Sequence, residues 1–365
     1  MTSVTGRGFG RMDTRKFWAY VCLVALLAGV MLQSGCASES TAPDSREDKI
    51  LIGFSMATLK EERWYIDRDE FVAAVQKMDA NVIVDVAYND ASEQLEQVRA
   101  MIGQGIDVLV IIPHDAVSAA AAVAMAHRAN VKVVSYDRLV LNADVDLYIS
   151  FDNEKVGQLQ AQAMLRAVPG GRYVIVDGPP SDYNSVMIRE GIEAVLKPHV
   201  DSGKITIVSE FATVDWMADE AADGINKLLQ DNVRIDAVIA ENDSLAGGAI
   251  KALSQHHLVP TVPVVGMDAD LAACQRVAEG QQLMTVYKPI RQLAVAAAGF
   301  AVKLARGEEI GVSGTMSDGK YYVPCYFIAP EAVNKDNMVD TVINDGFHKM
   351  AEVYMNVPQS KWPAQ

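Results

Sequence analysis

Short runs of β-branched and aliphatic residues recur along this chain, separated by longer segments whose apolar residues repeat at helical spacing. Seven of these runs are residues 50–54, 131–135, 173–176, 205–208, 237–239, 262–265 and 284–286. Strands that alternate with helices in this way predict an α/β fold with right-handed crossovers and a doubly wound parallel sheet. The alternation restarts near residues 148–151, and 365 residues can bury more than one core, so we expect two similar lobes.

The N-terminal segment has the composition of an export signal. Basic residues at positions 7, 11, 15 and 16 precede an apolar run at 17–32, which is shorter than the roughly 20 residues of a spanning helix. Ser34 and Gly35 then precede Cys36, so residues 1–35 resemble a bacterial lipoprotein signal and imply lipidation of Cys36. An ordinary cleavable signal with an incidental cysteine is the alternative. Residues 36–48 are polar and predict a flexible tether.

Composition and the absence of known motifs exclude several classes of function. A net charge of −15 argues against binding nucleic acid and suits a soluble body. The six histidines lack metal-ligand spacing, there is no phosphate loop, and no nucleophile motif is present, so we expect no metal, no cofactor and no catalytic residue. A glycosidase carboxylate pair stays open as an alternative. Cys274 and Cys325 could pair, and the sequence leaves that open too.

Each of the seven runs is followed by a cluster of polar residues, either directly or after a few residues. In parallel sheets ligands bind at the carboxyl ends of the strands, where these clusters would gather. The clusters hold carboxylates, amides and cations that suit sugar hydroxyls, and two indoles that suit the apolar faces of a sugar ring. The candidate ligand-binding residues are Arg63, Trp64, Asp137, Arg138, Asp182, Asn184, Trp216, Asn242, Asp268 and Lys288.

Several longer segments match one family. They include residues 107–113 (DVLVIIP), 148–157 (YISFDNEKVG), 196–204 (LKPHVDSGK), 285–290 (TVYKPI) and 345–349 (DGFHK). With these, the chain from about residue 49 to 348 resembles the type I periplasmic sugar-binding proteins of ABC importers, most closely the branch that binds D-xylose. The chain departs from the pattern of that branch at three residues, namely His114 and the adjacent Asp115, and Met267 before Asp268.

The resemblance implies an arrangement and a role. It implies two lobes joined by three crossovers, with residues 49–151 and 289–325 in the N-terminal lobe, 152–288 and 326–350 in the C-terminal lobe, and a tail at 351–365. The ten candidate residues would hold D-xylose, with Trp64 and Trp216 stacked on its ring, and the lobes would close on it like a hinged clamp. A periplasmic monomer of this kind delivers its sugar to an ABC permease and touches the membrane only through its lipid anchor.

Three other readings remain. The same clamp could take ribose, arabinose, galactose or glucose, or could present its sugar to a kinase or chemoreceptor as a sensor. A regulator of the LacI type shares the fold but needs a basic DNA-binding module before the first strand, where this chain has an apolar signal and an acidic tether.

Overall fold

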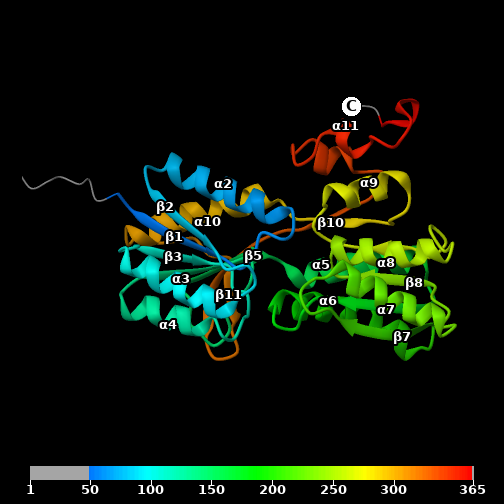
Figure 1. The fold of residues 1–365 in the computed structure, drawn as a ribbon, viewed down its shortest axis with the longest axis horizontal. Coiled ribbons are helices and arrows are strands. Elements are labelled where there is room, and N and C mark those ends of the chain that lie inside the picture. Colours follow the sequence, from blue (N-terminus) through cyan, green and yellow to red (C-terminus); the bar gives the residue numbers. More distant parts are fainter. Residues whose placement is uncertain (1–48, 364–365) are drawn as a thin grey trace, which may run out of the picture. The chain divides into compact units, whose positions relative to one another are not determined.

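The computed structural model describes residues 49–363. Most of these residues form two lobes, each built on a mainly parallel sheet with helices on both faces (Figure 1). The predicted signal, the tether and Cys36 lie outside the described residues. Within residues 49–363, no helix is both long and apolar enough to cross a membrane.

The first sheet has seven strands in the order β11-β12-β5-β4-β3-β1-β2. Its strands are β1 (Leu51–Met56), β2 (Asn81–Val86), β3 (Val108–Ile111), β4 (Lys132–Tyr136), β5 (Leu147–Phe151), β11 (Gly314–Ser317) and β12 (Tyr322–Ile328). Every neighbouring pair is parallel except β11 with β12, so the predicted parallel sheet carries one antiparallel edge strand.

Helices cover both faces of this sheet, as Figure 1 shows. They are α2 (Arg63–Lys77), α3 (Ala91–Gly103), α4 (Ala120–Arg128) and α10 (Ile290–Ala305). Alternate side chains of β1 and β3 pack with α2 and α10 in one apolar core, and the intervening side chains of β3 pack with α3 and α4 in another. Strands buried on both faces read as continuous apolar runs, which is why the sequence pattern was so clear.

The second lobe repeats the plan with fewer strands. Its sheet has the order β7-β6-β8-β9, formed by β6 (Gly171–Asp177), β7 (Ile205–Ala212), β8 (Ala237–Ala240) and β9 (Val264–Val265). A separate antiparallel pair consists of β10 (Thr285–Tyr287) and β13 (Glu331–Val333). The helices are α5 (Asn153–Ala167), α6 (Tyr183–Asp201), α7 (Ala218–Gln230), α8 (Asp243–Gln255) and α9 (Leu271–Glu279). The doubly wound α/β class predicted from the sequence is confirmed.

The chain passes between the lobes three times. It leaves the first sheet after β5 and returns between β10 and α10, and it leaves again after β12. The first two passages fall near Phe151 and Lys288. The third follows Ile328, because Cys325–Ile328 of β12 pair with β5. The first sheet therefore continues past residue 325, where the first lobe was expected to end. The exact lobe limits stay a prediction.

The C-terminal residues pack onto the second lobe. Val342, Val353 and Tyr354 share an apolar cluster with α9 and β13, and Trp362 lies against this cluster. This region also contains a π-helical turn (Val339–Ile343), α11 (Met350–Val353) and a 3-10 turn (Gln359–Lys361). The described part of the predicted tail is therefore folded onto α9.

Both cysteines of the folded body are free and buried. Cys274 lies in the cluster around α9, whereas Cys325, a residue of β12, lies in the core that the first sheet forms with α3 and α4. The two thiols are thus in different cores, and the structure does not pair them.

Candidate functional site

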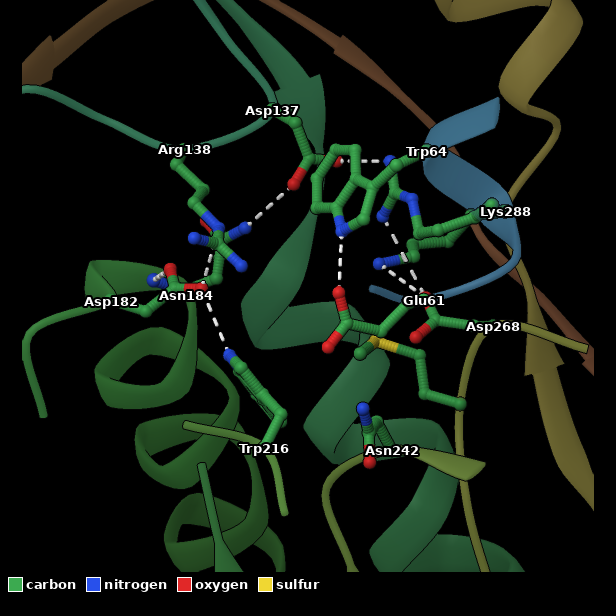
Figure 2. Close-up of a pocket in the computed structure, with 12 residues that line it drawn as sticks. Glu61, Trp64, Asp137, Arg138, Asp182, Asn184, Trp216, Asn242, Asp268 and Lys288 are labelled. Atoms are coloured by element: carbon green, nitrogen blue, oxygen red, sulfur yellow. Dashed lines mark hydrogen bonds and ion pairs between the residues drawn. The ribbon is translucent and has the colours of Figure 1, made fainter. Parts of the chain in front are cut away.

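The ten residues predicted from the sequence line one pocket, together with Glu61 and Met267 (Figure 2). All ten predicted side chains are buried, so the pocket is a polar site inside the body of the protein. That these residues bind a ligand stays a prediction.

Local structure explains how the side chains reach the pocket. Arg63 and Trp64 occupy the first turn of α2, and Asp137 and Arg138 follow β4 directly. From the second lobe, Asp182 caps the N-terminus of α6 by accepting a hydrogen bond from the backbone of Asn184. The remaining contributors follow strands or precede helices of the same lobe: Trp216 before α7, Asn242 as the N-cap of α8, Asp268 after β9 and Lys288 after β10.

Three of these residues have left-handed backbone conformations, with φ of 61° at Asp137, 55° at Trp216 and 102° at Asp268. Residues other than glycine rarely adopt positive φ, and for a bulky residue such as Trp the conformation is costly. Strained backbone that persists is held by its surroundings and tends to gather at functional sites. Here it aims a carboxylate or an indole into the pocket.

Arg63 is the centre of the charged network. Its guanidinium lies 2.7 Å from Asp137, 3.1 Å from Asp67 and 3.6 Å from Asp268. Burial alone would lower the pKa of Arg63, but the three surrounding carboxylates raise it well above its usual value. The hydroxyl of Tyr136 also donates to Asp67, so the arginine is fixed from behind by groups that do not line the pocket.

Two further ion pairs belong to the same charged network. Arg138 lies 2.8 Å from Asp182, and Lys288 lies 2.8 Å from Asp268. Burial would raise the pKa of Asp137, yet Arg63 and Lys288 together hold it below its usual value, so this carboxylate is ionised. Burial raises the pKa of Asp182, although Arg138 opposes that shift.

Both indoles are buried in the pocket wall, Trp64 at 3% exposed and Trp216 at 6%. The Trp64 ring nitrogen donates to Glu61 over 2.7 Å, and the guanidinium of Arg63 lies 4.3 Å from the centre of the ring. The Trp216 ring nitrogen donates to Asp182 over 3.3 Å. In Figure 2 the two indoles enter the pocket from different elements, Trp64 from α2 and Trp216 from the loop before α7.

The first turn of α2 and the loop after β4 belong to the first lobe, and the other predicted residues belong to the second. Several contacts therefore join the lobes across the pocket: Asn184 donates to Asp137 over 3.0 Å, and the Arg138–Asp182 pair spans the same gap. Ionised acceptors, fixed donors and flat apolar rings can orient individual hydroxyls and cover a ring face. Within residues 49–363, no group of three or more His, Cys, Asp or Glu side chains is arranged to hold a metal ion.

Sequence reasoning missed part of the site. Glu61 lines the pocket and holds Trp64, although it lies just two residues before the predicted Arg63. Asp67 was missed as well, although its position four residues after Arg63 places both on one face of α2. Met267 lines the pocket, whereas the other departure from the family pattern, His114-Asp115, does not.

Two doubly wound lobes on either side of a buried polar pocket are the arrangement of a binding protein for small molecules. The chain belongs to the periplasmic binding protein domain family, whose model matches residues 52–309.

Individual relatives agree with this assignment. The chain is 45% identical to the D-xylose-binding periplasmic protein of Escherichia coli, over 84% of this chain and 93% of the relative. It is 44% identical to the protein of the same name from Haemophilus influenzae, over 86% of this chain and 95% of the relative. Among solved structures, a carbohydrate transporter solute-binding protein from Chloroflexus aurantiacus in complex with D-glucose matches with a TM-score of 0.79 and 29% identity, covering 83% of this chain and 98% of that one.

Proposed function

We propose that this protein is the extracytoplasmic substrate-binding subunit of an ABC sugar importer and that it binds D-xylose between its two lobes. One observation carries the proposal: the predicted charged, amide and indole side chains converge from both lobes on one buried pocket. D-xylose is supported as the ligand because two relatives, 45% and 44% identical to this chain, are named D-xylose-binding periplasmic proteins. In this role the protein carries out no covalent chemistry.

The chemistry of the pocket fits a pentose. Asp137, Asp182 and Asp268 accept hydrogen bonds from hydroxyls, while Arg63, Arg138 and Lys288 donate to hydroxyl and ring oxygens. The amides of Asn184 and Asn242 do both, and Trp64 and Trp216 cover the faces of the ring. Because these groups are contributed by both lobes, a sugar bridges the lobes and favours their closed arrangement by its additional contacts there.

Calorimetric titration of the purified protein with xylose, ribose, arabinose, galactose and glucose tests the ligand. Small ligands can approach about −1 kcal/mol per heavy atom, so a pentose can bind with a Kd in the micromolar range or tighter. We expect D-xylose to bind most tightly. If none of the five sugars produces a heat of binding, the proposal is refuted.

A second ligand has a specific observation behind it, the D-glucose bound by the Chloroflexus relative. A hexose adds a hydroxymethyl group, which needs room beside the ring. If glucose binds more tightly than xylose in the same titration, the hexose assignment replaces the pentose one and the importer role is unaffected.

The location and partners belong to the same proposal. The basic and apolar N-terminal sequence and Cys36 support export and lipid anchoring, which would keep a monomeric binder close to its permease. Replacing Cys36 with Ser should release the exported protein from the membrane fraction. Deleting the gene should abolish xylose uptake, whereas loss of a xylose response with normal uptake would identify a sensor instead.

A further inference from the structure

Asp215 belongs to a polar cluster of the sequence, yet it does not line the sugar pocket. Its side chain accepts a 2.6 Å hydrogen bond from the amide of Asn89, and its backbone carbonyl accepts a 2.8 Å hydrogen bond from the amino group of Lys60. The same amino group lies 3.4 Å from the Asp215 carboxylate. Lys60 lies between β1 and α2, and Asn89 follows β2. Two loops of the first lobe therefore hydrogen-bond to one loop of the second.

The loop that carries Asp215, between β7 and α7, also positions Trp216. Trp216 follows Asp215 directly and holds its indole against the pocket with the backbone at a φ of 55°. Beneath the ring lies Gly178, where an added Cβ would come within 2.3 Å of the indole. The indole therefore has little freedom to shift while the loop is held.

The donor side of the contact is also rigid. Asn89 has a φ of 65°, a conformation that Asn tolerates better than most residues, and its backbone N–H donates to Ala57 over 2.8 Å. Its amide is thus presented at a fixed place beside the second lobe. The Lys60 and Asp215 side chains are 37% and 33% exposed, so their ion pair is open to screening by salt.

We infer that Asp215 is a latch: through Asn89 and Lys60 it stabilises the closed arrangement of the lobes and sets sugar affinity without touching the sugar. The inference rests on the proposed function. These contacts require the loops of both lobes to be together, so a movement that separates the two loops breaks them. A contact confined to one state shifts the equilibrium toward it and slows release of a ligand held there.

The test compares Asp215→Ala with Asp219→Ala. Asp219 is a matched control because its ion pair with Lys251 stays within the second lobe and its side chain is 79% exposed. For Asp215→Ala we expect D-xylose affinity to fall about 5- to 30-fold through faster dissociation, with the association rate nearly unchanged. Asp219→Ala should bind like the unaltered protein.

Two readouts separate a latch from a general loss of structure. Raising the salt concentration should weaken sugar binding by the unaltered protein more than by Asp215→Ala. In a double-mutant cycle, Asn89→Gly, which keeps the positive φ accessible, should cost little more once Asp215 is already Ala. Fully additive effects, or an Asp215→Ala affinity within twofold of the unaltered protein, would overturn the latch.

Small-angle scattering without sugar gives a measurement that does not depend on the ligand. We expect a larger radius of gyration for Asp215→Ala than for the unaltered protein and Asp219→Ala. If no sugar binds to the unaltered protein, the proposed function fails and the scattering comparison alone decides on the latch. Equal radii in that case reject it.

Discussion

The side-chain amide of Asn184, at the start of α6, donates a 3.0 Å hydrogen bond to Asp137, which follows β4 in the other lobe. Asp137 also accepts from Arg63 over 2.7 Å. One carboxylate thereby connects a cation of its own lobe with an amide of the other, and both of its partners line the pocket.

Replacing Asp137 with Ala should nearly abolish sugar binding. The change removes the nearest acceptor of Arg63, although Asp67 and Asp268 still neutralise its charge, and it removes the contact of Asn184 across the lobes. Loss of one buried, hydrogen-bonded member of a charge pair costs about 3 kcal/mol in binding, or roughly 100-fold in Kd. Calorimetry with D-xylose measures the effect, and circular dichroism checks that the variant is folded. Asp201→Ala, which removes an exposed ion pair with Lys197, is the control. An unchanged Kd would remove Asp137 from the site.

Trp fluorescence should report sugar binding through the two pocket indoles. Trp64 and Trp216 line the pocket, whereas Trp362 packs against Tyr354 in the C-terminal cluster. We expect the xylose-induced change to persist in Trp362→Phe and to shrink in Trp64→Phe and Trp216→Phe. Trp216→Ala should weaken binding at least about tenfold, because it removes a flat apolar surface from the ring. A signal change carried by Trp362 alone would contradict the stacking role.

Stability should fall as pH rises from about 4 to 6 because of a buried acid pair behind the site. Burial raises the pKa of Asp177 to about 6 and raises that of Glu241 well above its usual value. The unfolded chain releases these protons near pH 4 while the folded protein retains them, so the folded protein binds more protons in this window. The free energy of unfolding therefore decreases as pH rises through it.

Glu241→Gln tests this titration, since the amide stays neutral at every pH. Denaturant unfolding at pH 4, 5, 6 and 7 should show a smaller decline for this variant than for the unaltered protein. Asp201→Asn, an exposed surface change, should leave the slope as it was. Parallel curves for Glu241→Gln and the unaltered protein would mean that Glu241 is already ionised in the folded state.

The α5–α6 contact should not tolerate alanine at its glycines. A Cβ at Gly157 would lie 2.0 Å from the carbonyl oxygen of Ile188, and one at Gly191 would lie 2.0 Å from that of Glu154. Either substitution pushes the helices apart, and we expect the free energy of unfolding to fall by about 3 kcal/mol.

Gly103 in α3 provides the matched control for these two glycines. A Cβ there meets nothing within 4 Å, so Gly103→Ala should be neutral or slightly stabilising. Thermal and denaturant unfolding measure all three variants. A Gly157→Ala protein as stable as Gly103→Ala would show that the helices can separate without cost.

Much of the fold followed from local pattern. The apolar runs at residues 173–176, 205–208 and 237–239 lie within β6, β7 and β8, because the pattern of apolar residues reflects which sides of an element meet a core. Strands at the sheet edge were harder to predict. β11 is short and mostly exposed, and no sequence pattern indicated that it would add an antiparallel strand to the first sheet.

The residues of the site also fall into those that the sequence predicted and those that it did not. Asp137 and Lys288 could be picked out because each ends a strand, where ligands of parallel sheets bind. Glu61 could not, since nothing in its local sequence distinguishes it from an ordinary acidic residue of a solvated helix start. The spacing of Asp67 from Arg63 shows that they share a helix face, but it does not show that this face is buried. Their roles arise from contacts with Trp64 and Arg63 that exist only after α2 has formed and packed.

The sequence by itself determined that this chain alternates strands with helices, ends its strands in polar clusters, and places both indoles of residues 49–350 in such clusters. Only the tertiary structure decided which clusters meet. The reason is that spacing along the chain fixes the face and end of each element, whereas the distance between Asp137 and Asn184, or between Asn89 and Asp215, depends on how the crossovers bring two lobes together.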